Sequence, residues 1–157
     1  MKRIFISLLA AGAVALTVVG LATAAAPHRA TLKLRNTNLG MILVNGRGRT
    51  LYAFTRDRRN TDKCKKVTGC LQLWPAVTTR GKPIAGPGVK AHLIGTIAFK
   101  PGVRQVTYAG HPLYTYANDF EPGQTSYVNI LQFGGRWPAM AATMSTTCRV
   151  SVTSCTR

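Results

Sequence analysis

The stretch YAFTRD at residues 52–57 returns as YTYAND at residues 114–119, so two aromatic residues and an aspartate recur at an offset of 62 residues. A second phrase, Trp-Pro-Ala, stands at residues 74–76 and again at residues 137–139, at an offset of 63 residues. Two different motifs that repeat at nearly one period indicate a duplicated structural unit. The motif residues are Tyr52, Phe54, Asp57 and Trp74 in the first repeat and Tyr114, Tyr116, Asp119 and Trp137 in the second.

The spacing inside the repeated phrase allows two interpretations. On a strand, Tyr52 and Phe54 point to one face and the intervening Ala53 to the other. An aspartate three residues after the second aromatic commonly caps a turn. The first interpretation is therefore a set of core aromatics with a turn-capping acid. The second is a ligand surface, in which aromatic faces and a carboxylate converge on a small molecule or a cation.

The sequence around the two phrases is typical of short strands separated by turns. Runs rich in apolar and β-branched residues alternate with Gly, Pro and Asn, and Asn45-Gly46 favours a hairpin between residues 41–44 and 50–55. We therefore expect an all-β fold, with two tandem antiparallel β repeats forming one small sandwich or barrel-like domain. The expected parts are a first repeat at 31–77, a Gly/Pro-rich connector at 78–90, a second repeat at 91–142 and a Cys-containing tail at 143–157.

Residues 1–24 have the features of a secretory signal peptide. Two basic residues precede an apolar run at residues 4–19, and small residues follow at 22–26. We expect cleavage after Ala24, with Ala26 as the alternative position. A retained anchor is a further alternative, because the run is just long enough to span a bilayer. No lipobox cysteine is present, so the sequence predicts a secreted or periplasmic bacterial protein with no transmembrane segment after cleavage.

The four cysteines favour disulfides because an exported chain reaches an oxidising compartment. Three pairings can be drawn, and we expect the two local ones, Cys64–Cys70 and Cys148–Cys155. A zinc site is the rival interpretation, but neither cysteine spacing is usual for zinc.

The charge is strongly unbalanced, with 21 Lys and Arg against four acids and a net charge of +17. Without Lys2 and Arg3 the chain keeps 19 cations and a net charge of +15. A basic patch attracts polyanions, so candidate partners are anionic envelope polymers or lipid head groups; no specific nucleic-acid motif is present. A solvated cationic surface without a partner is the alternative. The expected anion-binding residues are Arg47, Arg49, Arg56, Arg58, Arg59, Lys63, Lys65 and Lys66.

Catalytic patterns are scarce in this sequence. No His-x-His, HExxH or Gly-x-Ser-x-Gly motif occurs. Paired carboxylates at Asp57 and Asp119 would suit a hydrolase, but nothing in the sequence brings them together. We therefore expect no catalytic residues, no cofactor and no metal, and lean against an enzyme. A cation site built from Asp57, Asp119, His92 or His111 remains an alternative.

Several ordered segments resemble a family of bacterial secreted repeats and lipoproteins defined by the Tyr-x-(Phe/Trp/Tyr)-x-x-Asp motif. Besides the motif, the matching segments are Leu39-Gly40, Ile42 to Val44, Gly48 to Tyr52, Cys64…Cys70…Trp74-Pro75, Gln105 to Tyr108 and Gly110 to Tyr114. The resemblance covers residues 38–140 and implies an exported β-repeat domain without a known activity. The chain departs from the family's pattern because it has no lipobox cysteine and carries an additional tail after Met140.

These observations predict an envelope or secreted β-repeat protein that acts as a non-enzymatic binding module for an anionic envelope partner. The alternative is a periplasmic metal or redox accessory protein that uses the Tyr and Asp motifs.

Overall fold

The computed structural model describes residues 28–142. The predicted signal segment, the tail at 143–157 and the predicted Cys148–Cys155 disulfide lie outside the described residues. The described part is built of strands and turns with three short helical segments, which confirms the all-β class. Among residues 28–142, no helix has the length and apolar character needed to cross a membrane.

The first repeat opens with an antiparallel hairpin of β1 (Thr31–Thr37) and β2 (Gly40–Asn45). The sequence predicted a strand at residues 41–44, within β2, but no strand at residues 31–37, where β1 lies. Charged residues alternate with leucines along β1, and this hides its strand character. The turn predicted at Asn45 is present, because the Asn45 side chain accepts hydrogen bonds from the backbone N–H groups of Arg47 and Arg49.

The second repeat contains the matching hairpin, β5 (Ile94–Lys100) and β6 (Val103–Tyr108). The short η2 (Ala91–Leu93) precedes it, and β7 (His111–Pro112) follows and pairs with β6. β3 (Thr78–Thr79) pairs with the edge of β6 that lies opposite β5. Together β3, β5, β6 and β7 make a four-stranded sheet.

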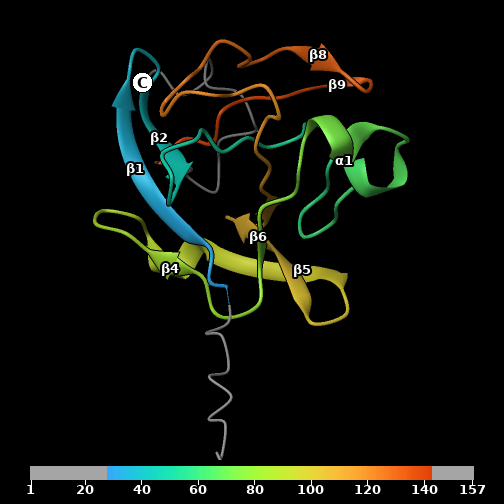
Figure 1. The fold of residues 1–157 in the computed structure, drawn as a ribbon, viewed down its shortest axis with the longest axis horizontal. Coiled ribbons are helices and arrows are strands. Elements are labelled where there is room, and N and C mark those ends of the chain that lie inside the picture. Colours follow the sequence, from blue (N-terminus) through green and yellow to red (C-terminus); the bar gives the residue numbers. More distant parts are fainter. Residues whose placement is uncertain (1–27, 143–157) are drawn as a thin grey trace, which may run out of the picture.

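The predicted connector supplies strands to both sheets. β3 joins β6 of the second repeat, while β4 (Ile84–Ala85) lies parallel to β1 of the first repeat. The described residues therefore form a three-stranded sheet, a four-stranded sheet and a separate two-stranded hairpin, and none of these sheets closes into a barrel. Figure 1 shows the long curved β1 on one side of the molecule and the β5–β6 pair across from it.

The segment after the second Trp-Pro pairs with the first repeat. The Met140 N–H donates to the Leu51 carbonyl at 2.8 Å, and the Leu43 N–H donates to the Met140 carbonyl at 2.8 Å. Leu51 in turn donates its N–H to the Leu43 carbonyl at 3.0 Å. Backbone groups from the second repeat thus complete the hydrogen bonding of the first.

The segment after the first Trp-Pro does the same in the second repeat. The Val77 N–H donates to the Leu113 carbonyl at 2.9 Å, and the Val106 N–H donates to the Val77 carbonyl at 2.8 Å. The two repeats therefore exchange their closing segments and cannot complete their sheets separately.

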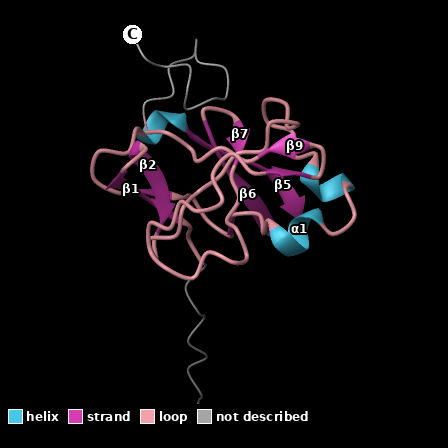
Figure 2. Cartoon of the chain, turned by 90° about the horizontal axis from the view of Figure 1, so that it is seen from above, coloured by secondary structure: helices cyan, strands magenta, loops and turns pink. Residues whose placement is uncertain are grey.

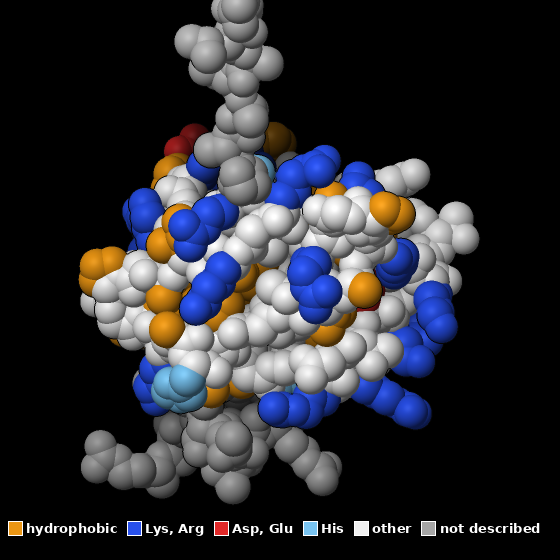
Figure 3. Space-filling view, turned by 90° about the horizontal axis from the view of Figure 1, so that it is seen from below, with side chains coloured by type: hydrophobic (Ala, Val, Ile, Leu, Met, Phe, Trp, Pro, Cys, Tyr) orange, Lys and Arg blue, Asp and Glu red, His pale blue; other side chains and the backbone are white. Residues whose placement is uncertain are grey.

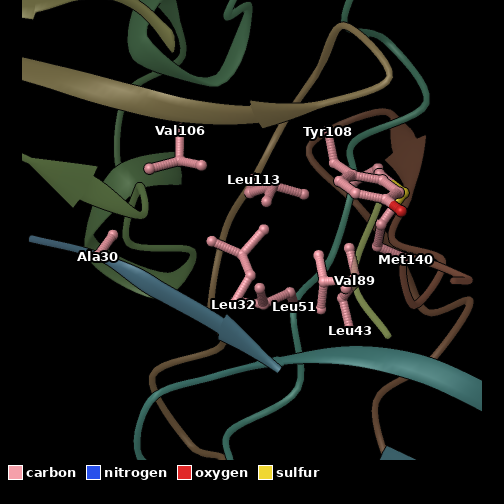
Figure 4. Packing of buried hydrophobic residues seen from close by; sticks show 10 residues of the cluster. Ala30, Leu32, Leu43, Leu51, Val89, Val106, Tyr108, Leu113 and Met140 are labelled. Atoms are coloured by element: carbon pink, nitrogen blue, oxygen red, sulfur yellow. The ribbon is translucent and has the colours of Figure 1, made fainter. Parts of the chain in front are cut away.

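The apolar core lies between the two large sheets (Figure 4). Leu32 and Leu43 come from the first sheet, Val106 and Tyr108 from the second, and Leu51, Leu113 and Met140 fill the space between them. All seven side chains are buried. This packing matches the expected sandwich-like arrangement, since one core holds both repeats together.

The remaining elements lie at the periphery. η1 (Cys64–Lys66) and α1 (Cys70–Leu73) are joined by the Cys64–Cys70 disulfide, which confirms the first predicted pairing. β8 (Leu131–Gln132) and β9 (Gly135–Arg136) form a hairpin (Figure 1), and Figure 2 shows β9 from above. Its turn residues Phe133 and Gly134 both have positive φ, as a two-residue type I′ turn requires.

Candidate functional site

The two copies of the repeated phrase meet at the centre of the molecule. The Tyr52 N–H donates to the Tyr114 carbonyl at 2.9 Å, and the Tyr114 N–H donates to the Tyr52 carbonyl at 3.0 Å. This antiparallel pair places the two phrases in equivalent positions. The side-chain parity follows the prediction, because Tyr52 and Phe54 join one buried cluster while Leu51 and Ala53 join the other.

The first tyrosine of each phrase donates its hydroxyl hydrogen bond to the aspartate of the opposite repeat. Tyr52 Oη donates to Asp119 Oδ2 at 2.8 Å, and Tyr114 Oη donates to Asp57 Oδ2 at 2.8 Å. We call these two reciprocal bonds the tyrosine–aspartate clasp. Each bond has its donor in one repeat and its acceptor in the other. Each copy of the phrase therefore supplies one tyrosine donor and one aspartate acceptor to the other copy.

The tryptophans extend this exchange through an aromatic stack. Trp74 and Trp137 lie face to face, with ring centroids 4.0 Å apart and planes 4° apart. Phe54 of the first repeat stacks on Trp137 of the second at 4.2 Å, and Tyr116 of the second packs on Trp74 of the first at 4.4 Å. Aromatic rings from the two repeats therefore alternate through the stack.

Gln132 satisfies both indole N–H groups. Trp74 Nε1 donates to the Gln132 side-chain oxygen at 2.8 Å, and Trp137 Nε1 donates to the Gln132 carbonyl at 3.3 Å. A buried indole needs such an acceptor. Gln132 could not be predicted from the sequence, because it stands outside both repeated motifs and no motif residue adjoins it in the chain.

The first aspartate lies in a crowded acidic setting. Asp57 Oδ1 accepts the Lys63 N–H at 2.7 Å, as expected for a turn cap, while Tyr114 Oη also lies 2.8 Å from Asp62 Oδ1. A phenol has a single O–H donor, so it can donate to only one of the two carboxylates at a time. Burial, with a contribution from the Asp62 charge, raises the pKa of Asp57 to about 6.

The second aspartate is isolated by comparison. Asp119 is fully buried, and its Oδ1 has no hydrogen-bond partner among residues 28–142. Burial raises the pKa of Asp119, although the Tyr52 hydrogen bond and the Arg49 charge act in the opposite direction. Burial also raises the pKa values of Tyr52 and Tyr114, which therefore act as hydroxyl donors.

This geometry favours the core-and-turn interpretation of the motif over an open ligand surface. Seven of the eight motif residues are buried, and Asp57 is partly exposed. Asp57 has Asp62 as its carboxylate neighbour, a residue that was not among the predicted site residues. Asp62 stands five residues after Asp57 and two residues before Cys64, where the disulfide loop begins. The matching position in the second repeat is Gln124, which is not an acid.

The predicted anion-binding residues come from two segments. Arg47 and Arg49 belong to the turn after β2, and the other six lie at residues 56–66, which we call the basic loop. Three of its side chains are tied to carbonyl oxygens of the second repeat: Arg56 to Phe133 at 2.8 Å, Arg59 to Ala109 at 3.2 Å, and Lys65 to Phe99. The loop is thus held on the surface at three points.

The carboxylates do not neutralise this surface through hydrogen bonds. Asp57, Asp62 and Asp119 all lie at hydrogen-bond distance from tyrosine hydroxyls. Every side-chain hydrogen bond that Lys and Arg donate within residues 28–142 goes to a backbone carbonyl or a threonine hydroxyl. Figure 3 shows the result on one face, where Lys and Arg side chains are spread widely and few carboxylates are visible.

Comparison with known proteins matches this chain to a family of repeats. A family model described as a secreted repeat of unknown function matches residues 33–78 and again residues 95–141. The two matched stretches each contain one copy of the phrase and one Trp-Pro. Searches of the curated proteins and of the solved structures found no match.

Proposed function

The chain belongs to a family of secreted repeats of unknown function, and from this premise we propose that it is a non-enzymatic module that binds an anionic partner of the cell envelope through the basic loop. The observation that carries the proposal is the separation of charges. The aspartates lie at hydrogen-bond distance from tyrosine hydroxyls of the core, while Lys and Arg remain at the surface without carboxylate hydrogen-bond partners.

The proposed site is prepared for binding because its backbone is already fixed. The Cys64–Cys70 disulfide closes the end of the basic loop, and Asp57 and Asp62 accept the backbone N–H groups of Lys63 and Lys65. A loop that is ordered before it binds loses less conformational entropy on association. Phosphate groups of wall polymers or lipid heads have the charge that such a loop attracts.

The proposal includes the location of the protein. We infer that the N-terminal segment directs export and is removed after Ala24 or Ala26, leaving a secreted or periplasmic protein. The anionic partner would therefore be met outside the cytoplasm.

The metal or redox alternative has less support. Within residues 28–142, no group of three or more His, Cys, Asp or Glu side chains is arranged to hold a metal ion. The two cysteines in this range are joined to each other.

The test compares two triple variants of equal charge on a heparin column and in titrations with inorganic polyphosphate. Arg58→Ser/Lys63→Ser/Lys66→Ser changes basic-loop side chains that donate no hydrogen bond in the structure. Arg80→Ser/Lys82→Ser/Lys90→Ser removes the same charge from residues 80–90. At about 1 kcal/mol for each cation near an anionic surface, the first variant should lose on the order of 100-fold in affinity at low salt. Equal losses in both variants would show that net charge alone drives binding and would contradict the site.

A further inference from the structure

An exposed leucine begins β8, at the end of the β8–β9 hairpin away from its Phe133-Gly134 turn. Leu131 is 65% exposed, one of four large apolar side chains exposed in the described part of the chain. The hairpin lies at the edge of the molecule in Figure 1. A single exposed apolar side chain is ordinary, so its meaning depends on what surrounds it.

Two arginines lie at the hairpin that carries Leu131. Arg136 lies directly opposite it in the β8–β9 register, and directly opposed residues project from the same face of a sheet. Arg56 of the basic loop reaches the same hairpin, where its guanidinium donates to the Phe133 carbonyl at 2.8 Å. Its side chain runs past Gly135, where an added Cβ would lie 2.9 Å from Arg56 Cγ.

The hairpin is rigid and free of negative charge. The Arg136 guanidinium donates to the Asn129 carbonyl at 3.1 Å, and the Phe133-Gly134 turn has the two positive φ angles of a tight hairpin. No Asp or Glu occurs in residues 122–142. Leu131 is therefore presented on a fixed support opposite Arg136, with Arg56 at the turn of the same hairpin.

The geometry points to the surface of an anionic lipid bilayer as the partner of this hairpin, with Leu131 entering the boundary of the acyl chains while Arg56 and Arg136 contact lipid phosphates. The inference rests on the proposed function and narrows its partner from anionic polymers and lipids to lipids. A soluble phosphate polymer offers charge but no apolar phase, so Leu131 would gain nothing from it. Basic side chains beside an apolar one are the combination that binds a charged membrane interface.

The chain contains a matched control for this idea. Phe120 is 71% exposed, but it stands directly before the exposed acid Glu121. An anionic membrane would repel that carboxylate. The two apolar side chains thus have similar exposure and opposite electrostatic surroundings.

The experiment measures co-sedimentation of the full chain with vesicles of phosphatidylglycerol and phosphatidylcholine, alongside binding to inorganic polyphosphate. Leu131→Ser should lower vesicle affinity about five- to tenfold, the loss expected when partial burial of one leucine is removed. The same variant should bind polyphosphate as the unaltered protein does. Phe120→Ser should leave both affinities unchanged, and equal melting temperatures confirm that neither variant disturbs the fold.

The outcomes separate this inference from the proposed function. If Leu131→Ser binds vesicles as tightly as the unaltered protein while the basic-loop variant is still weakened, the lipid inference is wrong and the anionic binding site stands. If Leu131→Ser weakens polyphosphate binding equally, the hairpin recognises charge without lipid, which also overturns the inference. A protein that binds neither vesicles nor polyphosphate contradicts both ideas.

Discussion

The two repeats use the same phrase in the same way, but the first surrounds it with groups that the second lacks. In both, a tyrosine reaches the aspartate of the other repeat at 2.8 Å. Around Asp57 the first repeat adds Asp62, a disulfide and the basic loop, whereas Asp119 is fully buried and accepts its side-chain hydrogen bond from Tyr52. The shared part therefore explains the fold, and the difference indicates where a surface function could develop.

The largest expected loss of stability comes from the stacked tryptophans, which both repeats contribute. Trp74→Ala and Trp137→Ala should each lower the free energy of unfolding by about 3–5 kcal/mol, because each removes a fully buried indole from the stack. Urea denaturation measures both. Since each indole packs on rings of both repeats, the two losses should agree within about 1 kcal/mol. A loss below about 1 kcal/mol for either variant would show that the stack does not join the repeats.

A smaller effect should distinguish the two tyrosines. Tyr52→Phe leaves the fully buried Asp119 without its one donor, which should cost about 1–3 kcal/mol. Tyr114→Phe leaves Asp57 with the Lys63 N–H, so its cost should be nearer 0.5–1 kcal/mol. Chemical denaturation of both variants under one condition gives the difference. A larger loss for Tyr114→Phe would reverse the assignment of the two environments.

The pH dependence of stability should reflect the crowded acidic setting of the first repeat. The pKa of Asp57 is raised from 3.8 to about 6 in the folded protein, so between these values the unfolded chain releases a proton that the fold retains. This contribution to stability is present below pH 3.8 and is lost as the pH rises through 6. The expected loss is about 1 kcal/mol after allowance for solvent screening at a partly exposed group.

Melting temperatures recorded from pH 3.5 to 7 measure this loss, and Asp57→Asn should flatten that part of the profile. Asp119 also has a raised pKa, so the variant retains some fall with rising pH. An unchanged profile in Asp57→Asn would place the titrating group elsewhere.

The duplication, the strand parity at Tyr52 and Phe54 and the Cys64–Cys70 disulfide could be predicted from the sequence, because each depends on local spacing. The exchange between repeats could not, since two similar copies do not reveal whether Tyr52 bonds to Asp57 or to Asp119. Gln132 was missed for a related reason, because its role exists only after both tryptophans have met. β1 was missed because its charged residues obscured an alternating pattern with two leucines.

The basic loop remains a prediction as a binding site, but its physical setting is clearer than the sequence allowed. Asp62 was counted only as one of four acids, whereas the structure places it at the clasp and under the Lys65 N–H. Asp57 and Asp62 thus hold the loop backbone while the cations face outward.

The central claim is that the tyrosine–aspartate clasp connects the repeats, and a double-mutant cycle tests it most directly. Tyr52→Phe is combined with Asp119→Asn in one cycle and with Asp57→Asn in a second, and urea unfolding gives the coupling energies. We predict a coupling of about 1 kcal/mol or more for Tyr52 with Asp119, and a coupling below about 0.5 kcal/mol for Tyr52 with Asp57. The opposite ranking would show that each tyrosine serves the aspartate of its own repeat and would contradict the account.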